Sequence, residues 1–151
     1  MSNKHAISIL NDLIKTTLDS MKGFHEAAED ARDTRSAATF TEFAQDRSQV
    51  ASQLQDEVRR LGGEPENSSS FIAAAHRGFM DLKQAISGKN DNALVSEVER
   101  GEDHIKSKFE DALEDDKLGD ETRQVIERAY QSVRAGHDRA SALKHSISYS
   151  Q

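Results

Sequence analysis

The sequence predicts an all-α protein, and its composition and hydrophobic periodicity both support that fold class. Hydrophobic residues make up 35% of the 151-residue chain, aromatic residues only 5%, and proline occurs once. Residues with high helix propensity, such as alanine, glutamate and leucine, are abundant. Apolar residues recur at alternating spacings of three and four, which is typical of helices that bury one face. We expect a single domain, 1–151, with its own core.

The first half of the chain is expected to form a hairpin of two long helices, about 3–33 and 36–62. An apolar stripe runs along the whole first range. The second helix begins near Ser36, a good N-cap, and stops before Gly62 and Gly63, because glycine favours helix C-termini.

The second half is expected to form one short helix and two long ones. The short helix covers about 70–87, has one apolar face and ends at Gly88. The long helices cover about 90–116 and 120–147, with Gly119 at the break between them.

The short helix suggests how the two halves are connected. At about 1.5 Å per residue, it spans about 27 Å, enough to return along most of the bundle. The sequence therefore predicts a ferritin-like four-helix bundle, made of two antiparallel hairpins joined by a short crossover helix. A five-helix bundle with short links is the alternative.

Two charged residues, Arg47 and Glu102, occupy inward positions in otherwise apolar stripes. Each lies about a dozen residues from the same end of the bundle, so they are expected at the same depth. Antiparallel pairing brings His137, and His25 or Tyr130, close to this layer. We therefore expect a polar layer in the middle of the core.

This layer has two interpretations. The first is a structural ion pair between Arg47 and Glu102, and the second is a single divalent metal held by Glu102 with His137 or His25. A di-iron centre is not expected, because no Glu-x-x-His pair occurs and Arg47 would repel metal ions. The expected cofactor is therefore none, with one divalent metal as the alternative.

Two glycines, Gly101 and Gly136, lie next to the expected polar layer. A glycine inside a helix lowers its propensity, a cost that is offset where a bulky neighbour such as Arg47 must approach closely. The same glycines could instead leave a gap for a small ligand.

Several segments resemble a bacterial family of small ferritin-like four-helix-bundle proteins of unknown function. The matching segments are Leu10-Asn-Asp-Leu13, Glu57-Val-Arg-Arg-Leu-Gly-Gly63, His76-Arg-Gly-Phe-Met-Asp-Leu82 and Glu97-Val-Glu-Arg-Gly-Glu-Asp-His104, with His137-Asp138 later. The resemblance covers most of the chain and implies the same bundle fold. It implies no catalytic residue and no assigned activity.

Charge and cysteine content exclude several classes of partner. The chain has 27 acidic and 20 basic residues, a net charge of -7, and the basic residues are scattered, so nucleic acid and anionic membranes are not expected partners. Cysteine is absent, which excludes disulfides and thiolate sites. No apolar run approaches a membrane span and the segment after Met1 is polar, so we expect a cytoplasmic protein.

No motif for nucleophilic catalysis or phosphate binding is present. We therefore expect a non-enzymatic protein that acts through self-association, as a homodimer, or through an unknown protein partner, with a role in stress suggested by similarly built bacterial proteins. The alternatives are a metal-binding or metal-dependent redox protein with a reduced site in the bundle core, and a small-ligand binder in that core.

Overall fold

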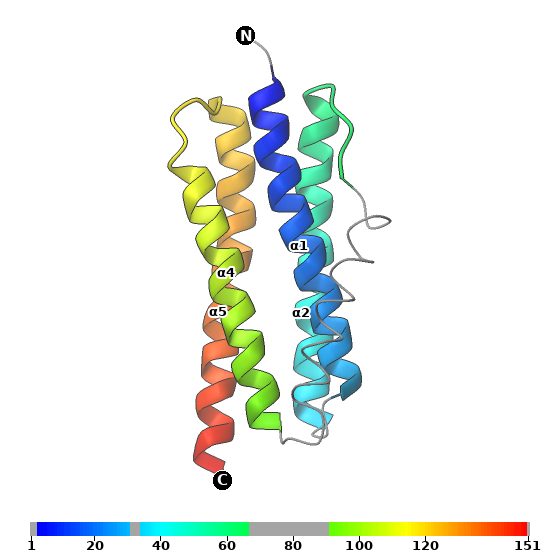
Figure 1. Ribbon diagram of the computed structural model, residues 1–151, viewed down its shortest axis with the longest axis vertical. Coiled ribbons are helices and arrows are strands. Elements are labelled where there is room, and N and C mark those ends of the chain that lie inside the picture. The colour runs from blue at the N-terminus through cyan, green and yellow to red at the C-terminus, as the bar shows by residue number, and fades with distance from the viewer. Residues whose placement is uncertain (1–2, 31–33, 67–90, 151) are drawn as a thin grey trace.

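The computed structural model describes residues 3–30, 34–66 and 91–150, and these ranges form an all-helical bundle (Figure 1). They contain four helices and no strand, which confirms the all-α expectation. The short helix expected over 70–87 lies outside the described residues. The four helices have bounds close to the expected ranges: α1 (Lys4–Asp30), α2 (Thr34–Arg60), α4 (Asp91–Leu113) and α5 (Asp120–Ser150).

The helices form two antiparallel hairpins that pack side by side. α1 packs mainly against α2, and α4 against α5, while α2 also meets α5 and α1 also meets α4. α2 ends at the end of the bundle where α1 begins, and α4 begins at the opposite end (Figure 1). Each helix therefore has antiparallel neighbours on both sides.

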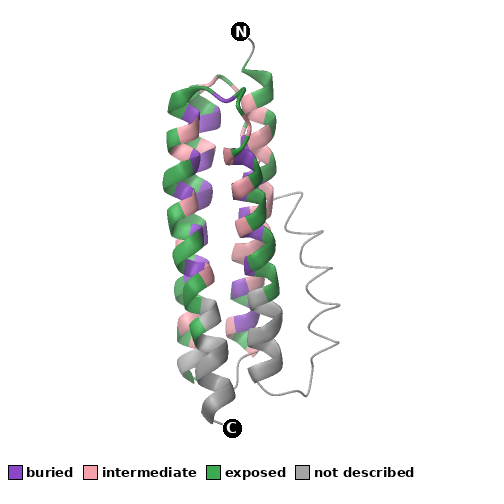
Figure 2. Cartoon of the chain, turned by 90° about the vertical axis from the view of Figure 1, so that its left-hand side faces the viewer, coloured by how far each residue is buried: buried purple, intermediate pink, exposed green. Residues whose placement is uncertain are grey.

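The core lies along the axis between the hairpins, where the buried residues face inward (Figure 2). Aliphatic residues dominate it, and four phenylalanines are buried with them, Phe24, Phe40, Phe43 and Phe109. None of the described helices is long and apolar enough for a transmembrane span. The main cluster includes Leu10, Leu13, Ile14, Leu18, Val50, Leu54, Val58, Ile105, Phe109, Ile126, Ala129 and Val133.

α2 ends in a glycine-dependent turn, as its sequence indicates. Gly62 has φ 86°, and the N–H of Gly62 donates to the carbonyl of Arg59 while that of Gly63 donates to Val58, both at about 3 Å. This is the Schellman arrangement, which satisfies the last carbonyls of a helix. A Cβ on Gly63 would lie 2.8 Å from Ile7 Cδ1, so α1 packs directly on the turn.

One asparagine of α1 holds the chain that leaves this turn. The side chain of Asn11 donates to the carbonyl of Glu64 at 3.2 Å and accepts the N–H of Glu66 at 2.9 Å. Gln55 of α2 donates to the carbonyl of Glu66 at 3.0 Å. The segment up to residue 66 therefore runs back along the α1–α2 hairpin.

Arg123 closes the turn between α4 and α5. Its guanidinium donates to the carbonyls of Leu113 and Asp115, both at 2.5 Å. A helix leaves its last carbonyls without intrahelical donors, and a cation at that position also complements the helix dipole. The second hairpin thus has its own side-chain cap.

Candidate functional site

The middle of the core holds a buried ion pair between Arg47 of α2 and Glu102 of α4. The Arg47 side chain is 0% exposed and that of Glu102 is 1% exposed. Arg47 Nη2 donates to Glu102 Oε2, and Arg47 Nε donates to Ser20 Oγ of α1 at 3.3 Å. The structure therefore brings together the two charged residues that the stripes place at the same depth.

Helical register explains why both side chains point inward. Arg47 follows Phe43 by four residues and precedes Val50 by three, and both neighbours are buried. Glu102 stands three residues before Ile105, which is also buried. At 100° per residue, these spacings keep the charged side chains on the core face of their helices.

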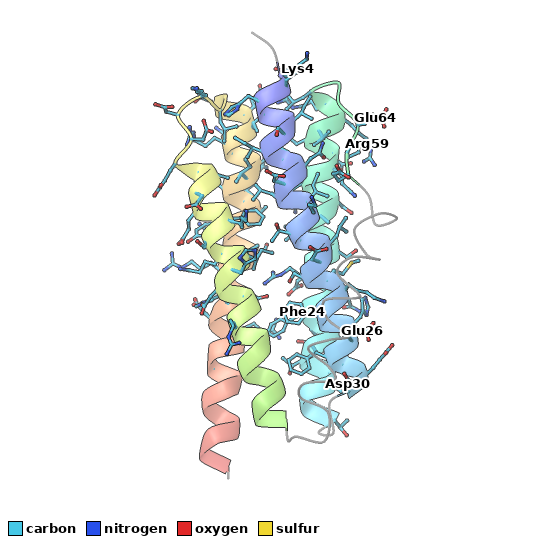
Figure 3. All side chains as sticks on the ribbon, viewed as in Figure 1. Lys4, Phe24, Glu26, Asp30, Arg59 and Glu64 are labelled. Carbon is cyan, nitrogen blue, oxygen red and sulfur yellow. The ribbon has the colours of Figure 1, made fainter. Side chains whose placement is uncertain are left out.

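Aromatic rings make the surroundings of the pair apolar. The rings of Phe24 and Phe43 lie 4.9 Å apart between centroids, and Arg47 Cζ lies 5.7 Å from the centroid of Phe24. Figure 3 shows Phe24 reaching from α1 toward the inside of the bundle. A guanidinium over an aromatic face gains a favourable cation–π interaction, which is larger in a desolvated site.

Gly136 of α5 provides the space that Arg47 occupies. Gly136 is buried, and a Cβ added to it would lie 2.7 Å from Arg47 Nη2 and 3.2 Å from Nη1. Gly101 behaves differently from the expectation: it is exposed, and a Cβ there would meet nothing within 4 Å. It precedes the inward Glu102 by one residue, and a 100° rotation takes it off the core face.

The ion pair leaves two polar atoms without hydrogen-bond partners. Among the described residues, nothing pairs with Arg47 Nη1 or with Glu102 Oε1, although both atoms are buried. Burial raises the pKa of the Glu102 carboxyl, and the nearby Arg47 guanidinium opposes this shift without cancelling it. Removing either partner would leave the other as an uncompensated buried charge.

His137 lies beside this layer but makes its contacts at the surface. Its side chain is 21% exposed, and its imidazole contacts Asp103 of α4 at 2.5 Å and Asp138 at 3.4 Å. Burial by itself lowers the pKa of His137, but the hydrogen bonds with Asp103 and Asp138 outweigh it and raise the pKa overall. The charge of His137 lowers the pKa of Glu102, although burial of Glu102 outweighs this effect.

His25 does not belong to the buried layer, which corrects its place in the expected site. It is exposed on α1, whereas the preceding residue, Phe24, is 4% exposed and fills the inward position. One residue turns a helix by 100°, so both cannot face the core. Tyr130 is half-buried and donates to Glu110 at 2.7 Å, away from the pair.

Within the described ranges, no group of three or more His, Asp or Glu side chains could hold a metal ion. Glu102 Oε2 accepts a hydrogen bond from Arg47, and the imidazole of His137 contacts Asp103. A guanidinium at the centre of the layer also disfavours a bound cation.

A second buried carboxylate, Glu57 of α2, did not appear among the expected site residues. It is 4% exposed, accepts two hydrogen bonds of 2.6 Å from Arg60 and one of 2.8 Å from Thr122 of α5. Arg60 follows at a spacing of three, a pattern that normally indicates a surface pair. The hydrogen bond from Thr122 of α5 places this carboxylate against the neighbouring helix.

The chain was compared with known protein families and with curated proteins. A family model described as a domain of unknown function, DUF2383, matches residues 5–115, which is most of the chain and includes Arg47 and Glu102. No match to a curated protein was found. The match agrees with the resemblance to a family without an assigned activity, and the protein is a member of the DUF2383 family.

Proposed function

We propose that the protein is a non-enzymatic helical bundle of ferritin-like topology that acts through association with itself, as a homodimer, or with another protein. The observation that carries this proposal is the buried Arg47–Glu102 pair in the middle of the core. Metal-dependent bundles of this architecture place their ligands in that layer. Here a guanidinium fills it, which leaves the outer surface for function.

The ferritin-like topology is supported by where the helices end. α2 and α4 are neighbours in the described order of helices, yet α2 ends at one end of the bundle and α4 begins at the other (Figure 1). Asn11 and Gln55 hold residues 64–66 against the first hairpin. This path fits a connection that travels the length of the bundle, as a crossover helix would.

Metal loading tests the non-metal part of the proposal. Protein purified without tag or chelator would be loaded anaerobically with iron, manganese or zinc, and the bound metal measured beside Glu102→Ala. We expect no stoichiometric metal in either protein. Stoichiometric metal in the wild type that is lost in Glu102→Ala, with helicity retained, would instead establish a metal site at this layer.

Molar mass in solution tests the association part. Multi-angle light scattering over a range of protein concentrations is expected to give the mass of a dimer, twice 16.8 kDa. A monomer at every concentration would contradict self-association. In that case, purification of a defined complex with another protein from native cells would support association with a different partner, and failure to find one would contradict the association proposal.

A reduced metal site remains the second candidate, because Glu102 Oε1 is buried and lacks a partner among the described residues. Such an oxygen has free acceptor capacity, and His137 stands nearby on α5. Metal uptake by His137→Ala tests this candidate. If Glu102 and His137 hold the metal together, both Glu102→Ala and His137→Ala should lose it. Metal that is lost in Glu102→Ala but retained in His137→Ala would show that His137 is not a ligand.

A ligand-binding gap in the core has less support. The space beside Gly136 is occupied by the Arg47 guanidinium, and Gly101 faces outward. An open pocket lies elsewhere, at the bundle end where α1 and α5 begin, and is lined by both acidic and basic side chains, among them His5, Arg60 and Glu121. Nothing in that lining converges on one ligand chemistry.

A further inference from the structure

The apolar stripes of the two hairpins do not by themselves distinguish axial positions that differ by seven residues. The stripes repeat with a period close to seven residues, so a slide of seven residues keeps apolar side chains facing apolar side chains. At 1.5 Å per residue this slide is about 10.5 Å. A polar contact between the hairpins could distinguish the correct register from the shifted one.

Arg47 makes such a contact, because it touches residues of all three other helices. It donates to Ser20 of α1 within its own hairpin and to Glu102 of α4 in the other hairpin, and its guanidinium lies against Gly136 of α5. Both its carboxylate and the space it occupies thus come from the second hairpin.

Sliding the second hairpin by seven residues would remove both features at once. Because α4 and α5 are antiparallel, the same slide brings Phe109 to the position of Glu102 and Ala129 to the position of Gly136. Arg47 would face an aromatic ring instead of a carboxylate, and a Cβ would occupy the space that Gly136 leaves open. The buried guanidinium would then have lost its counter-charge.

We infer that the Arg47–Glu102 pair, seated against Gly136, sets the axial register between the two hairpins. This role is separate from the proposed function and does not depend on it. Another buried carboxylate, Glu57, cannot set register as strongly, since Arg60 of its own helix would still pair with it after a slide. Arg47 takes its carboxylate from across the bundle.

Two glycine substitutions test the packing of the Arg47 guanidinium against Gly136. Gly136→Ala and Gly101→Ala make the same change inside a helix, and helix propensity alone favours alanine by up to about fivefold in the folding equilibrium constant. We expect Gly101→Ala to raise the midpoint of urea unfolding and Gly136→Ala to lower it. In an Arg47→Leu/Glu102→Leu background, Gly136→Ala should no longer be unfavourable. If Gly136→Ala still lowers the urea midpoint in that background, the loss does not come from a clash with Arg47, and the inference is contradicted.

Spin labels test the register directly, and the absence of cysteine in the chain makes their placement simple. Cysteines at the exposed positions Ser48 of α2 and Gln124 of α5 would carry labels for pulsed dipolar spectroscopy. The wild type should give one narrow distance distribution. Arg47→Leu/Glu102→Leu should add a second population, whose label separation differs by several ångströms because one hairpin has moved by about 10.5 Å.

A folded, cooperative Arg47→Leu/Glu102→Leu protein with the single wild-type distance would overturn the inference. If that variant does not fold, the label distances of Gly136→Ala are compared with those of Gly101→Ala instead. A broader or shifted distribution in Gly136→Ala alone supports the register role, and identical narrow distributions in both glycine variants overturn it.

Discussion

At the scale of single residues, the arginine in the core is the most informative side chain. Arginine is almost never fully buried unless it is paired, yet Arg47 is 0% exposed. Its pairing with Glu102, its hydrogen bond to Ser20 and its contact with Phe24 together offset the cost of removing the charge from water. The pair is therefore better understood as a constraint on the native arrangement than as a source of net stability.

A double-mutant cycle on the ion pair tests this view. Arg47→Leu and Glu102→Leu singly should each lower the free energy of unfolding by about 3–5 kcal/mol, because each leaves one buried charge unpaired. The double variant should recover much of that loss. Urea unfolding followed by circular dichroism measures all three. Losses that simply add would show that the two residues are not energetically coupled.

Glu57 makes a prediction about acid stability. Hydrogen bonds from Arg60, and secondarily from Thr122, hold the pKa of Glu57 below its ordinary value of 4.5 even though burial opposes this shift. A folded-state pKa below the unfolded one contributes stability above about pH 4.5, and this contribution is lost as the pH falls through the folded value.

The free energy of unfolding should therefore fall less steeply below about pH 4.5 in Glu57→Gln than in the wild type. Urea unfolding at a series of pH values measures the slope. Glu64→Gln, at an exposed position, is the matched control and should follow the wild-type curve. Equal slopes for Glu57→Gln and the wild type would exclude this role for Glu57.

At the scale of elements, the helix ends are fixed by a few local contacts. α2 stops at Gly62 because that residue adopts a left-handed conformation, and the turn is satisfied by backbone hydrogen bonds. α4 stops where Arg123 reaches back from α5 to its last carbonyls. The sequence indicates the end of α2 through Gly62. It does not indicate that Arg123 binds the carbonyls of Leu113 and Asp115, because that contact forms only when the turn brings α5 back to the end of α4.

Substitution of Gly62 tests the first of these ends. Gly62→Ala should lower the free energy of unfolding by about 1 kcal/mol or more, because an L-residue with a Cβ is strained at φ 86°. Gly62→Asn should cost less, since asparagine tolerates this conformation. Thermal or urea unfolding measures both, and an alanine variant as stable as the asparagine variant would argue against the turn.

At the scale of the whole molecule, the protein consists of two hairpins, and each is well packed internally. The hairpins contact each other through the apolar core and through polar side chains. Glu57 with Thr122 and Arg139 with Glu42 connect α2 to α5 at different heights. The exit of the chain from the first hairpin is set by Asn11, which binds residues 64–66 and so determines the direction in which the connection begins.

Asn11 therefore makes a prediction about the connection between hairpins. Asn11→Ala should speed hydrogen exchange at the Glu66 amide, which donates to Asn11 Oδ1, and cost about 1 kcal/mol in stability. Asn11→Asp retains the acceptor for Glu66 but loses the donor to Glu64, so Glu66 should stay protected. Exchange at Glu66 that is as slow in Asn11→Ala as in the wild type would mean that the Asn11 side chain is not what holds this segment.

The sequence by itself determined the helical class, the positions of the helix breaks and the two charged residues in apolar stripes. These follow from local propensity, capping and a 3.6-residue period, which act within one helix. It also placed Arg47 and Glu102 at one depth, because rise per residue is constant.

Only the tertiary structure decided which neighbours those residues meet. It turned His25 outward, filled the space at Gly136 with a guanidinium, left Gly101 exposed and buried Glu57 against α5. Such outcomes depend on the rotation of each helix about its axis and on its packing partner, and periodicity fixes that rotation only to within about one residue. A 100° turn then separates a core side chain from a solvated one.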